Sequence, residues 1–184
     1  FFMRIYGMET DVLGLALGGL NLVAGGLGAL LGGFLGDRLS RRDGRWLVWL
    51  PALAIFVSVP FTLIGLFQQT AWMALAFLVV PMGAMTVYSG PIYGLVQSLV
   101  EPRMRAVASA TFLFIVGIIG MGGGPLAAGI ISDLATGMFG REALRYALAI
   151  ICVFSLWSVI HFCIAGNHVR EELARAANGK GGGE

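Results

Sequence analysis

The chain has 184 residues, of which 58% are hydrophobic and only 12% are charged, and its formal net charge is +2. Soluble domains carry about 25% charged residues, so this composition excludes an ordinary soluble domain. The small net charge gives no reason to expect nucleic acid as a partner.

Five stretches contain no Asp, Glu, Lys or Arg: 12–36, 46–67, 71–100, 106–132 and 146–165. Each is long enough for the roughly 20 residues with which a helix crosses a hydrocarbon core of about 30 Å. Lipid cannot satisfy backbone N–H and C=O groups, and none of these runs alternates as barrel strands do. The sequence therefore predicts an all-α transmembrane protein with spans at about 12–36, 46–67, 71–100, 105–133 and 143–165.

The two ends of the chain differ from these spans. Residues 1–5 are too short to cross a bilayer, yet they are apolar and do not begin with Met. We interpret them as the end of a truncated span that precedes a bundle over residues 6–166. Residues 167–177 can form a short helix with Val169, Leu173 and Ala176 on one face. The tail, 167–184, is expected to be disordered from about residue 178, where nothing can be buried.

Basic residues alternate between the connections. The 37–45 loop holds four arginines, the 101–105 loop holds two, and the 68–70 loop has no charge. Summed over alternate connections, nine of the 12 Lys and Arg residues fall on one side. The positive-inside rule then places both arginine loops and the C-terminus in the cytoplasm. We expect a multi-pass protein of the plasma or inner membrane.

The first full span is rich in glycine, and its glycines fall within about 80° of helix face. They are Gly14, Gly18, Gly25, Gly28, Gly32 and Gly36. Small residues at this spacing let helix backbones approach closely in lipid. Asn21 shares that face and is predicted to point at a neighbouring helix. The fourth span has the same pattern in Gly117, Gly120, Gly122–Gly124 and Gly129, interrupted by Pro125.

The first and fourth spans also end alike. Gly33 and Asp37 close the first in a Gly-x-x-x-Asp sequence, and Gly129 and Asp133 close the fourth on the opposite side. Inverted-topology repeats leave this kind of trace. The truncated span and five full spans would then form two repeats of three helices.

The segment 33–42, Gly-Phe-Leu-Gly-Asp-Arg-Leu-Ser-Arg-Arg, resembles the loop motif G-x-x-x-D-R-x-G-R-R of the major facilitator superfamily. It departs from the motif at Ser40, where the family has glycine. In that family the loop follows the second span and, degenerately, the eighth. Because only five spans accompany it here, the resemblance implies the C-terminal six-helix half of such a transporter. The partner would be the missing N-terminal half of the same chain.

The chain is similar to the spinster-type branch in particular. The similarity is strongest in Glu101-Pro102-x-x-Arg105-Ala106, in the segment 124–133 and in the segment 144–147, Leu-Arg-Tyr-Ala. It implies an exporter of lysophospholipids or sphingolipid-like amphiphiles, either facilitative or coupled to protons. The residues that the branch uses for proton coupling lie in the N-terminal half.

The span 71–100 is the most polar, and its polar residues share one helix face. Thr86, Ser89, Tyr93 and Gln97, together with Asn21 of the first span, are the candidates for lining a substrate cavity. The alternative is hydrogen bonding between helices, worth on average about 0.6 kcal/mol per contact. Pro81 and Pro91 are expected to bend this span, because each removes a backbone donor.

The cytoplasmic loop motif supplies a gating hypothesis. Asp37 can pair with Arg41 or Arg42, or meet the positive N-terminus of a helix from the other half. Such contacts, with Gly33 and Arg38 in the same motif, would latch the cytoplasmic side shut and release it as the halves rock. The alternative is that the arginines only fix the topology.

Two more positions are weaker candidates. Asp133 and Arg145 could form a corresponding pair at the outer face. His161 lies deep in the last span, and there a neutral, hydrogen-bonded histidine is favoured over a proton relay.

No enzyme motif is complete. The sequences around Ser89 and Asp37 lack glycines that intramembrane proteases need, and no Walker loop, dinucleotide motif or metal-spaced His/Cys cluster occurs. We expect no enzyme, metal or cofactor, and a bilayer, a small or amphiphilic substrate and a candidate coupling proton as partners. The favoured function is secondary active transport of an amphiphile such as a lysolipid. The alternatives are transport of another organic solute and a non-transporting helical scaffold or subunit.

Overall fold

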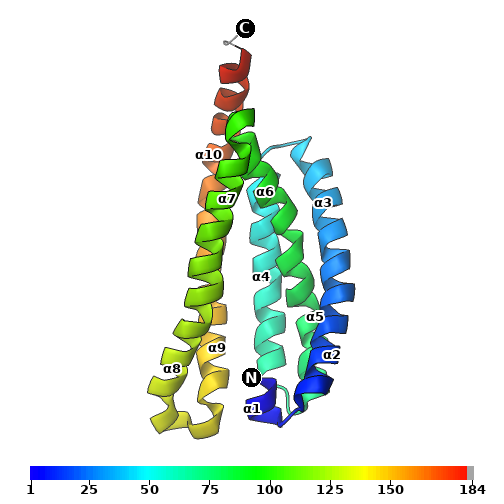
Figure 1. Ribbon diagram of the computed structural model, residues 1–184, viewed down its shortest axis with the longest axis vertical. Coiled ribbons are helices and arrows are strands. Elements are labelled where there is room, and N and C mark those ends of the chain that lie inside the picture. The colour runs from blue at the N-terminus through cyan, green and yellow to red at the C-terminus, as the bar shows by residue number, and fades with distance from the viewer. Residues whose placement is uncertain (182–184) are drawn as a thin grey trace.

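The computed structural model describes residues 1–181 as antiparallel helical rods (Figure 1), and residues 182–184 lie outside that description. Four stretches are long and apolar enough to cross a membrane: Thr10–Ser40, Trp46–Leu66, Ala71–Ser98 and Pro102–Leu173. The last is a hairpin, because the chain turns back near Gly140 and its two arms lie side by side. No strand occurs in the described part. The expected all-helical membrane architecture is therefore found.

The first half of the chain consists of a short helix, α1, followed by three rods that contain helices α2 to α6. Helix α1 covers Phe2–Tyr6 and ends at Gly7, whose φ of 67° favours glycine. The first long rod consists of α2 (Thr10–Leu20), a π-helical segment η1 (Asn21–Gly25) and α3 (Gly26–Ser40). Helix α4 covers Trp46–Leu66, and the third rod consists of α5 (Ala71–Val87) and α6 (Ser89–Ser98).

The remaining two rods form the hairpin. Its first arm consists of η2 (Pro102–Met104), α7 (Arg105–Ile115), a second π-helical segment η3 (Val116–Gly123) and α8 (Gly124–Phe139). The turn η4 covers Gly140–Glu142, and Gly140 has a φ of 54°. The second arm consists of α9 (Ala143–Phe154) and α10 (Leu156–Gly181).

The rods extend beyond the charge-free stretches. The first runs to Ser40 and includes Asp37, because a helix can carry charged residues where it leaves the bilayer. Helix α10 continues unbroken to Gly181, so the short helix expected at 167–177 is part of the last rod. Disorder is expected from about residue 178, whereas the structure has residues 178–181 in helix α10. The rest of that expectation concerns residues 182–184, which lie outside the described residues.

The third rod is interrupted at Tyr88, between α5 and α6. Pro91 has no N–H to donate to the carbonyl of Val87 four residues earlier, so the regular helix cannot pass this point without losing a bond. Pro81, by contrast, lies inside α5. The interruption of the helix therefore lies next to Pro91, in the span for which a bend is predicted.

The tightest helix contact in the bundle is a glycine seam, formed by Gly28, Gly32 and Gly36 of α3. A Cβ on Gly28 would overlap the carbonyl of Gly83, and one on Gly32 would lie 2.7 Å from the Cα of Val87. A Cβ on Gly36 would lie 3.0 Å from Cγ of Pro91. The seam therefore follows α3 along both α5 and α6, as the glycine pattern of the first span predicts.

The other predicted glycine contacts are not formed within the described chain. A Cβ on Gly14 or Gly18 would meet nothing within 4 Å. The same holds for Gly117, Gly123 and Gly129 of the fourth span. The close contact predicted for this span is therefore not formed among residues 1–181, and it stays a prediction for contacts outside them. Its glycines lie in and after a π-helical segment at the outside of the bundle.

The end of the bundle that carries the 41–45 loop is held by the extension of α10. Val169 is buried with Val48 of α4 and Leu95 of α6. A Cβ on Gly44 would lie 2.7 Å from Cδ1 of Leu173. The predicted apolar face of the tail therefore packs on the bundle through Val169 and Leu173.

A prediction follows for the seam. Gly28→Ala should destabilise the protein by about 1–3 kcal/mol, the usual cost of overpacking, because its Cβ has no space beside Gly83. Gly26→Ala, on the same helix, meets nothing within 4 Å and should be neutral or stabilising. Thermal unfolding in detergent measures both. Equal midpoints for the two variants would contradict the seam.

Candidate functional site

The four polar residues predicted to line a cavity divide between two surroundings. Thr86 is half-buried on the α3 side, where its hydroxyl donates to the carbonyl of Gly83 at 2.8 Å. The hydroxyl of Ser89 donates to the carbonyl of Met85 at 3.2 Å, within the same rod. Both hydroxyls therefore satisfy backbone carbonyls next to the interruption at Tyr88.

Tyr93 and Gln97 instead face helix α7. The ring of Tyr93 packs edge-on against that of Phe112, with centroids 5.4 Å apart and an interplanar angle of 89°. The side-chain amide of Gln97 donates to the hydroxyl of Ser109 at 3.3 Å. An aromatic pair and an amide–hydroxyl pair thus lie one turn apart between α6 and α7. Gln97 itself is exposed and its remaining hydrogen-bonding capacity is available.

Asn21 does not reach a neighbouring helix. It is exposed and begins the π-helical segment η1, and its Oδ1 lies beside Gly25 of the same segment. The predicted orientation assumed a regular helix. The wider π turn rotates the residues after it, so the face calculated at 100° per residue does not hold across this point.

The loop motif is exposed at one end of the bundle, and its acidic residue has no arginine partner. Among residues 1–181 no ion pair joins Asp37 to an arginine, although Arg38, Arg41 and Arg42 are close in sequence. The nearby ion pair joins Arg45 and Asp43 instead, with Nε and Oδ2 3.9 Å apart. The suggested pairing of Asp37 with Arg41 or Arg42 is therefore not formed here.

Asp37 also occupies an electrostatically poor position. It lies in the last turn of α3, where the helix dipole is negative and acidic groups are disfavoured. Gly33 and Gly36, which both precede it, bring no donor side chain. A carboxylate in this position gains stability only from a positive partner outside the helix.

At the opposite end, Arg145 is held by aromatic rings rather than by Asp133. Its guanidinium lies 6.0 Å from the ring centroid of Phe1 and 5.9 Å from those of Tyr6 and Phe67. Its Nε lies 2.9 Å from a carboxylate oxygen of Glu142. We call Phe1, Tyr6 and Phe67 the aromatic cage. The expected Asp133–Arg145 pair is wrong, because Glu142 is one helical turn away and Asp133 is exposed on α8.

The cage joins three parts of the chain that are distant in sequence. The hydroxyl of Tyr6 donates to the carbonyl of Gln68 at 2.7 Å, which fastens α1 to the loop before α5. Burial raises the pKa of Tyr6, while Arg145 opposes the shift and Glu142 adds to it. Sequence analysis missed the cage. The available signal was that Phe1, Tyr6, Phe67 and Arg145 all fall at ends of rods on the same side.

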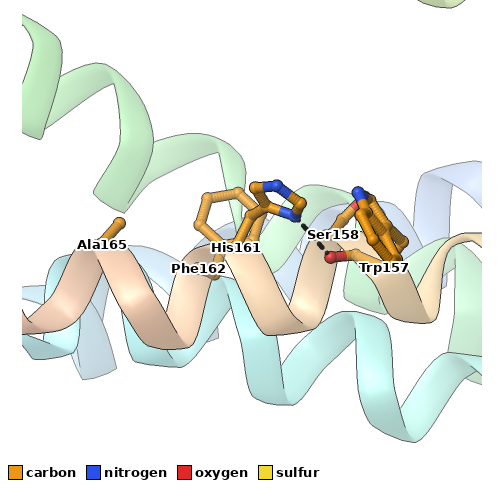
Figure 2. Close-up of a pocket in the computed structure, with 5 residues that line it drawn as sticks. All are labelled: Trp157, Ser158, His161, Phe162 and Ala165. Carbon is orange, nitrogen blue, oxygen red and sulfur yellow. Dashed lines mark hydrogen bonds between the residues drawn. The ribbon is translucent and has the colours of Figure 1, made fainter.

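His161 lies on the surface of α10 beside a cavity of about 460 Å³ (Figure 2). Its Nδ1 is 2.9 Å from the carbonyl of Trp157, and the two rings are 5.3 Å apart. Since a carbonyl only accepts, this hydrogen bond requires a proton on Nδ1. The histidine is hydrogen-bonded within its own helix, and its protonation state stays a prediction. No group of three His, Cys, Asp or Glu side chains able to hold a metal occurs within residues 1–181.

The comparison with curated proteins gives a relative of known class. The chain is 33% identical over 178 residues to an MFS-type efflux pump of Mycolicibacterium smegmatis, and the alignment covers 96% of this chain. It covers 41% of the pump, so the chain spans about two fifths of the length of this relative. No protein-family model matches the chain. The chain is thus similar to part of an MFS-type pump, and this similarity does not distinguish the spinster branch.

The aromatic cage gives a prediction that needs no substrate. Arg145→Gln should lower stability by about 1–2 kcal/mol, because it removes one ion pair and the cation–π contacts in a partly shielded site. Arg103→Gln is the matched control, since Arg103 forms an exposed pair with Glu101 and should cost less than about 0.5 kcal/mol. Unfolding midpoints in detergent test this. A similar loss in both variants would mean that the cage adds nothing.

Proposed function

We propose that the chain is the C-terminal half of an efflux transporter of the major facilitator superfamily, and that the whole protein exports an amphiphilic solute by secondary active transport. The observation that carries the proposal is the alignment with an MFS-type efflux pump across 96% of this chain. The loop motif at 33–42, which lies within the aligned region, also supports it. The end with the arginine loops and the C-terminus would face the cytoplasm of a plasma or inner membrane.

Alternating access needs blocks that move as units, and the glycine seam supplies one. At Gly28 and Gly32 the backbones of α3 and α5 are in direct contact, and the Thr86 hydroxyl beside Gly28 is held by its bond to the carbonyl of Gly83. Such interfaces either hold or separate, and they do not deform gradually. In the proposed transporter α3, α5 and α6 therefore move together.

The two π-helical segments support an inverted repeat. If the first and fourth spans are aligned so that Asp37 matches Asp133, the segment Asn21–Gly25 matches residues 117–121. These residues lie within the second π-helical segment, Val116–Gly123. π-Helical turns are rare and occur mostly at functional positions. Their equivalent placement in the first and fourth full spans is what two inverted three-helix repeats would produce.

The α6–α7 contact is the proposed substrate surface. Tyr93 and Phe112 offer an aromatic face, and Gln97 and Ser109 offer an amide and a hydroxyl one turn away. An amphiphile matches this arrangement, with its apolar part on the rings and its polar part on the amide. A lysolipid is one such molecule. Proton coupling would depend on residues outside this chain.

Asp37 is proposed to latch the cytoplasmic side through a partner outside this chain. Its carboxylate has no arginine partner within residues 1–181 and lies at the negative end of α3. In one conformation of the transporter, a helix N-terminus or a basic side chain of the other half would pair with this carboxylate and offset the unfavourable helix dipole.

Substitutions in the proposed substrate surface should reduce export. Tyr93→Ala and Gln97→Ala in the complete transporter are each expected to lower substrate flux by about three- to tenfold, because each removes a contact worth roughly 0.5–1.5 kcal/mol. Met85→Ala, on an exposed part of α5, should leave flux unchanged. Export of a labelled lysolipid from vesicles measures this. Normal flux in both variants, with normal amounts of protein, would remove the cavity assignment.

The latch makes a different kinetic prediction. Asp37→Asn should alter the maximal transport rate and leave the half-saturating substrate concentration nearly unchanged, because the latch acts on the conformational step. Asp43→Asn is the control, since Asp43 already pairs with Arg45 of the same loop. An effect of Asp37→Asn on apparent affinity alone would count against the latch.

A further inference from the structure

A groove between α3, α4 and α5 is lined only by Ala, Gly, Leu and Val. Its volume is about 350 Å³, and it includes Leu27 and Leu31 of α3, Leu53 and Val57 of α4 and Val79 of α5. Leu27, Leu31 and Leu53 are each more than half exposed, at 57%, 53% and 51%. The groove is therefore open to its surroundings and offers no polar side chain to a ligand.

On α4 the groove lies in the half of the helix nearest to the arginine loop. Helix α4 starts at Trp46, and its lining residues fall between Leu50 and Val57. On α3, Leu31 precedes the helix end at Ser40 by nine residues, about 14 Å at 1.5 Å per residue. On the third rod the lining extends back to Val79, past the middle of the rod, so the groove runs from the middle of the bundle toward the loop that connects α3 and α4.

That connecting loop is positively charged and its charges are not neutralised locally. Arg41 and Arg42 are exposed, and neither forms an ion pair within residues 1–181, as is also true of Arg38. The acidic Asp43 is already engaged with Arg45. Guanidinium groups bind phosphate oxygens in bidentate fashion, and basic pockets beside membrane helices bind anionic lipid headgroups.

We propose that this groove binds one acyl chain of an anionic phospholipid from the arginine-side leaflet, whose headgroup phosphate is held by Arg41 and Arg42. The apolar lining selects a hydrocarbon chain, and the separation of about 14 Å between groove and loop is within the length of one lipid molecule. The charge of the loop selects an anionic headgroup over a zwitterionic one. This site is separate from the proposed substrate surface, because α6 and α7 contribute nothing to it.

A lipid in this position would act on the helices that carry the loop motif. Its acyl chain would contact Gly28, Gly83 and Val87, which are residues of the glycine seam. Its headgroup would lie beside Asp37 and could shift the electrostatics of the proposed latch. Occupancy would therefore stabilise the α3–α4–α5 unit.

The test uses the intact protein in detergent with three additions: dioleoyl-phosphatidylglycerol, dioleoyl-phosphatidylcholine and glycerol phosphate. We expect phosphatidylglycerol to raise the unfolding midpoint by several degrees more than phosphatidylcholine and to be retained in native mass spectrometry. Glycerol phosphate should have no effect. Equal shifts with the two lipids, or the full shift with glycerol phosphate, would overturn the proposal, the second result indicating a free-anion site.

Variants separate the two parts of the site. The double variant Arg41→Gln/Arg42→Gln should abolish the preference for phosphatidylglycerol, whereas Arg103→Gln should keep it. Ala54→Trp should fill the groove and reduce retention of both lipids, and Leu31→Trp tests the same point from the other wall if the first variant does not fold. Preserved preference in the double arginine variant would overturn the headgroup assignment.

A final measurement decides between lipid and protein as the occupant. Leu53→Cys, in a protein with Cys152→Ser and Cys163→Ser, should be labelled in membranes by a lipid-soluble maleimide and should form no crosslink to protein. A crosslink to another segment of the same protein or to a second copy, without retained phosphatidylglycerol, would overturn the proposal.

Discussion

The packing of the first rod against the third depends on direct contact between their backbones along the glycine seam. Between lipid-embedded helices there is no hydrophobic driving force, so association depends on packing and polar contacts. Gly28 and Gly32 let α3 touch the main chain of α5, and Gly36 lets it touch Pro91 at the start of α6. The seam therefore crosses the interruption at Tyr88. It holds together a rod that Pro91 would otherwise leave loosely joined.

The two ends of the bundle are secured by different interactions. At the arginine end, α10 extends past the bilayer-length segment and packs Val169 against Val48 and Leu95. At the other end, the aromatic cage encloses Arg145 and joins α1, the loop after α4 and α9. Cation–π contacts suit that position, because rings tolerate the membrane interface where a bare ion pair would be weakened by water.

The all-helical membrane architecture could be predicted from the sequence, because charge-free runs of this length have few structural solutions in lipid. The contact of α3 with a neighbour followed from its glycines. The partner could not be derived, since Gly83, Val87 and Pro91 have no pattern that singles them out. The direction of Asn21 was wrong because a π-helical turn leaves no clear trace in residue type.

Long-range partners were the least predictable part of the candidate site. Asp133 and Arg145 were paired by analogy with the loop motif at the other end of the bundle. The carboxylate of Glu142, one helical turn from Arg145, forms the ion pair instead. Thr86 shared a calculated face with Tyr93, but the interruption at Tyr88 ends the regular rotation between them. Side-chain positions that depend on helix phase are lost wherever the helix departs from 3.6 residues per turn.

The glycines of this chain lie in two kinds of surroundings, covered by a neighbouring helix or uncovered. In α3 the glycines are covered by α5 and α6, whereas in η3 and α8 a Cβ on Gly123, Gly124 or Gly129 would meet nothing within 4 Å. Large apolar side chains on the same arm, among them Met121 at 80% and Leu134 at 80%, are also exposed. An arm with glycines and apolar side chains, but no neighbour on that face, suits close approach by another membrane helix. The proposed transporter supplies such a helix from its other half, and a rigid seam beside an uncovered arm is what rocking of one half against the other requires.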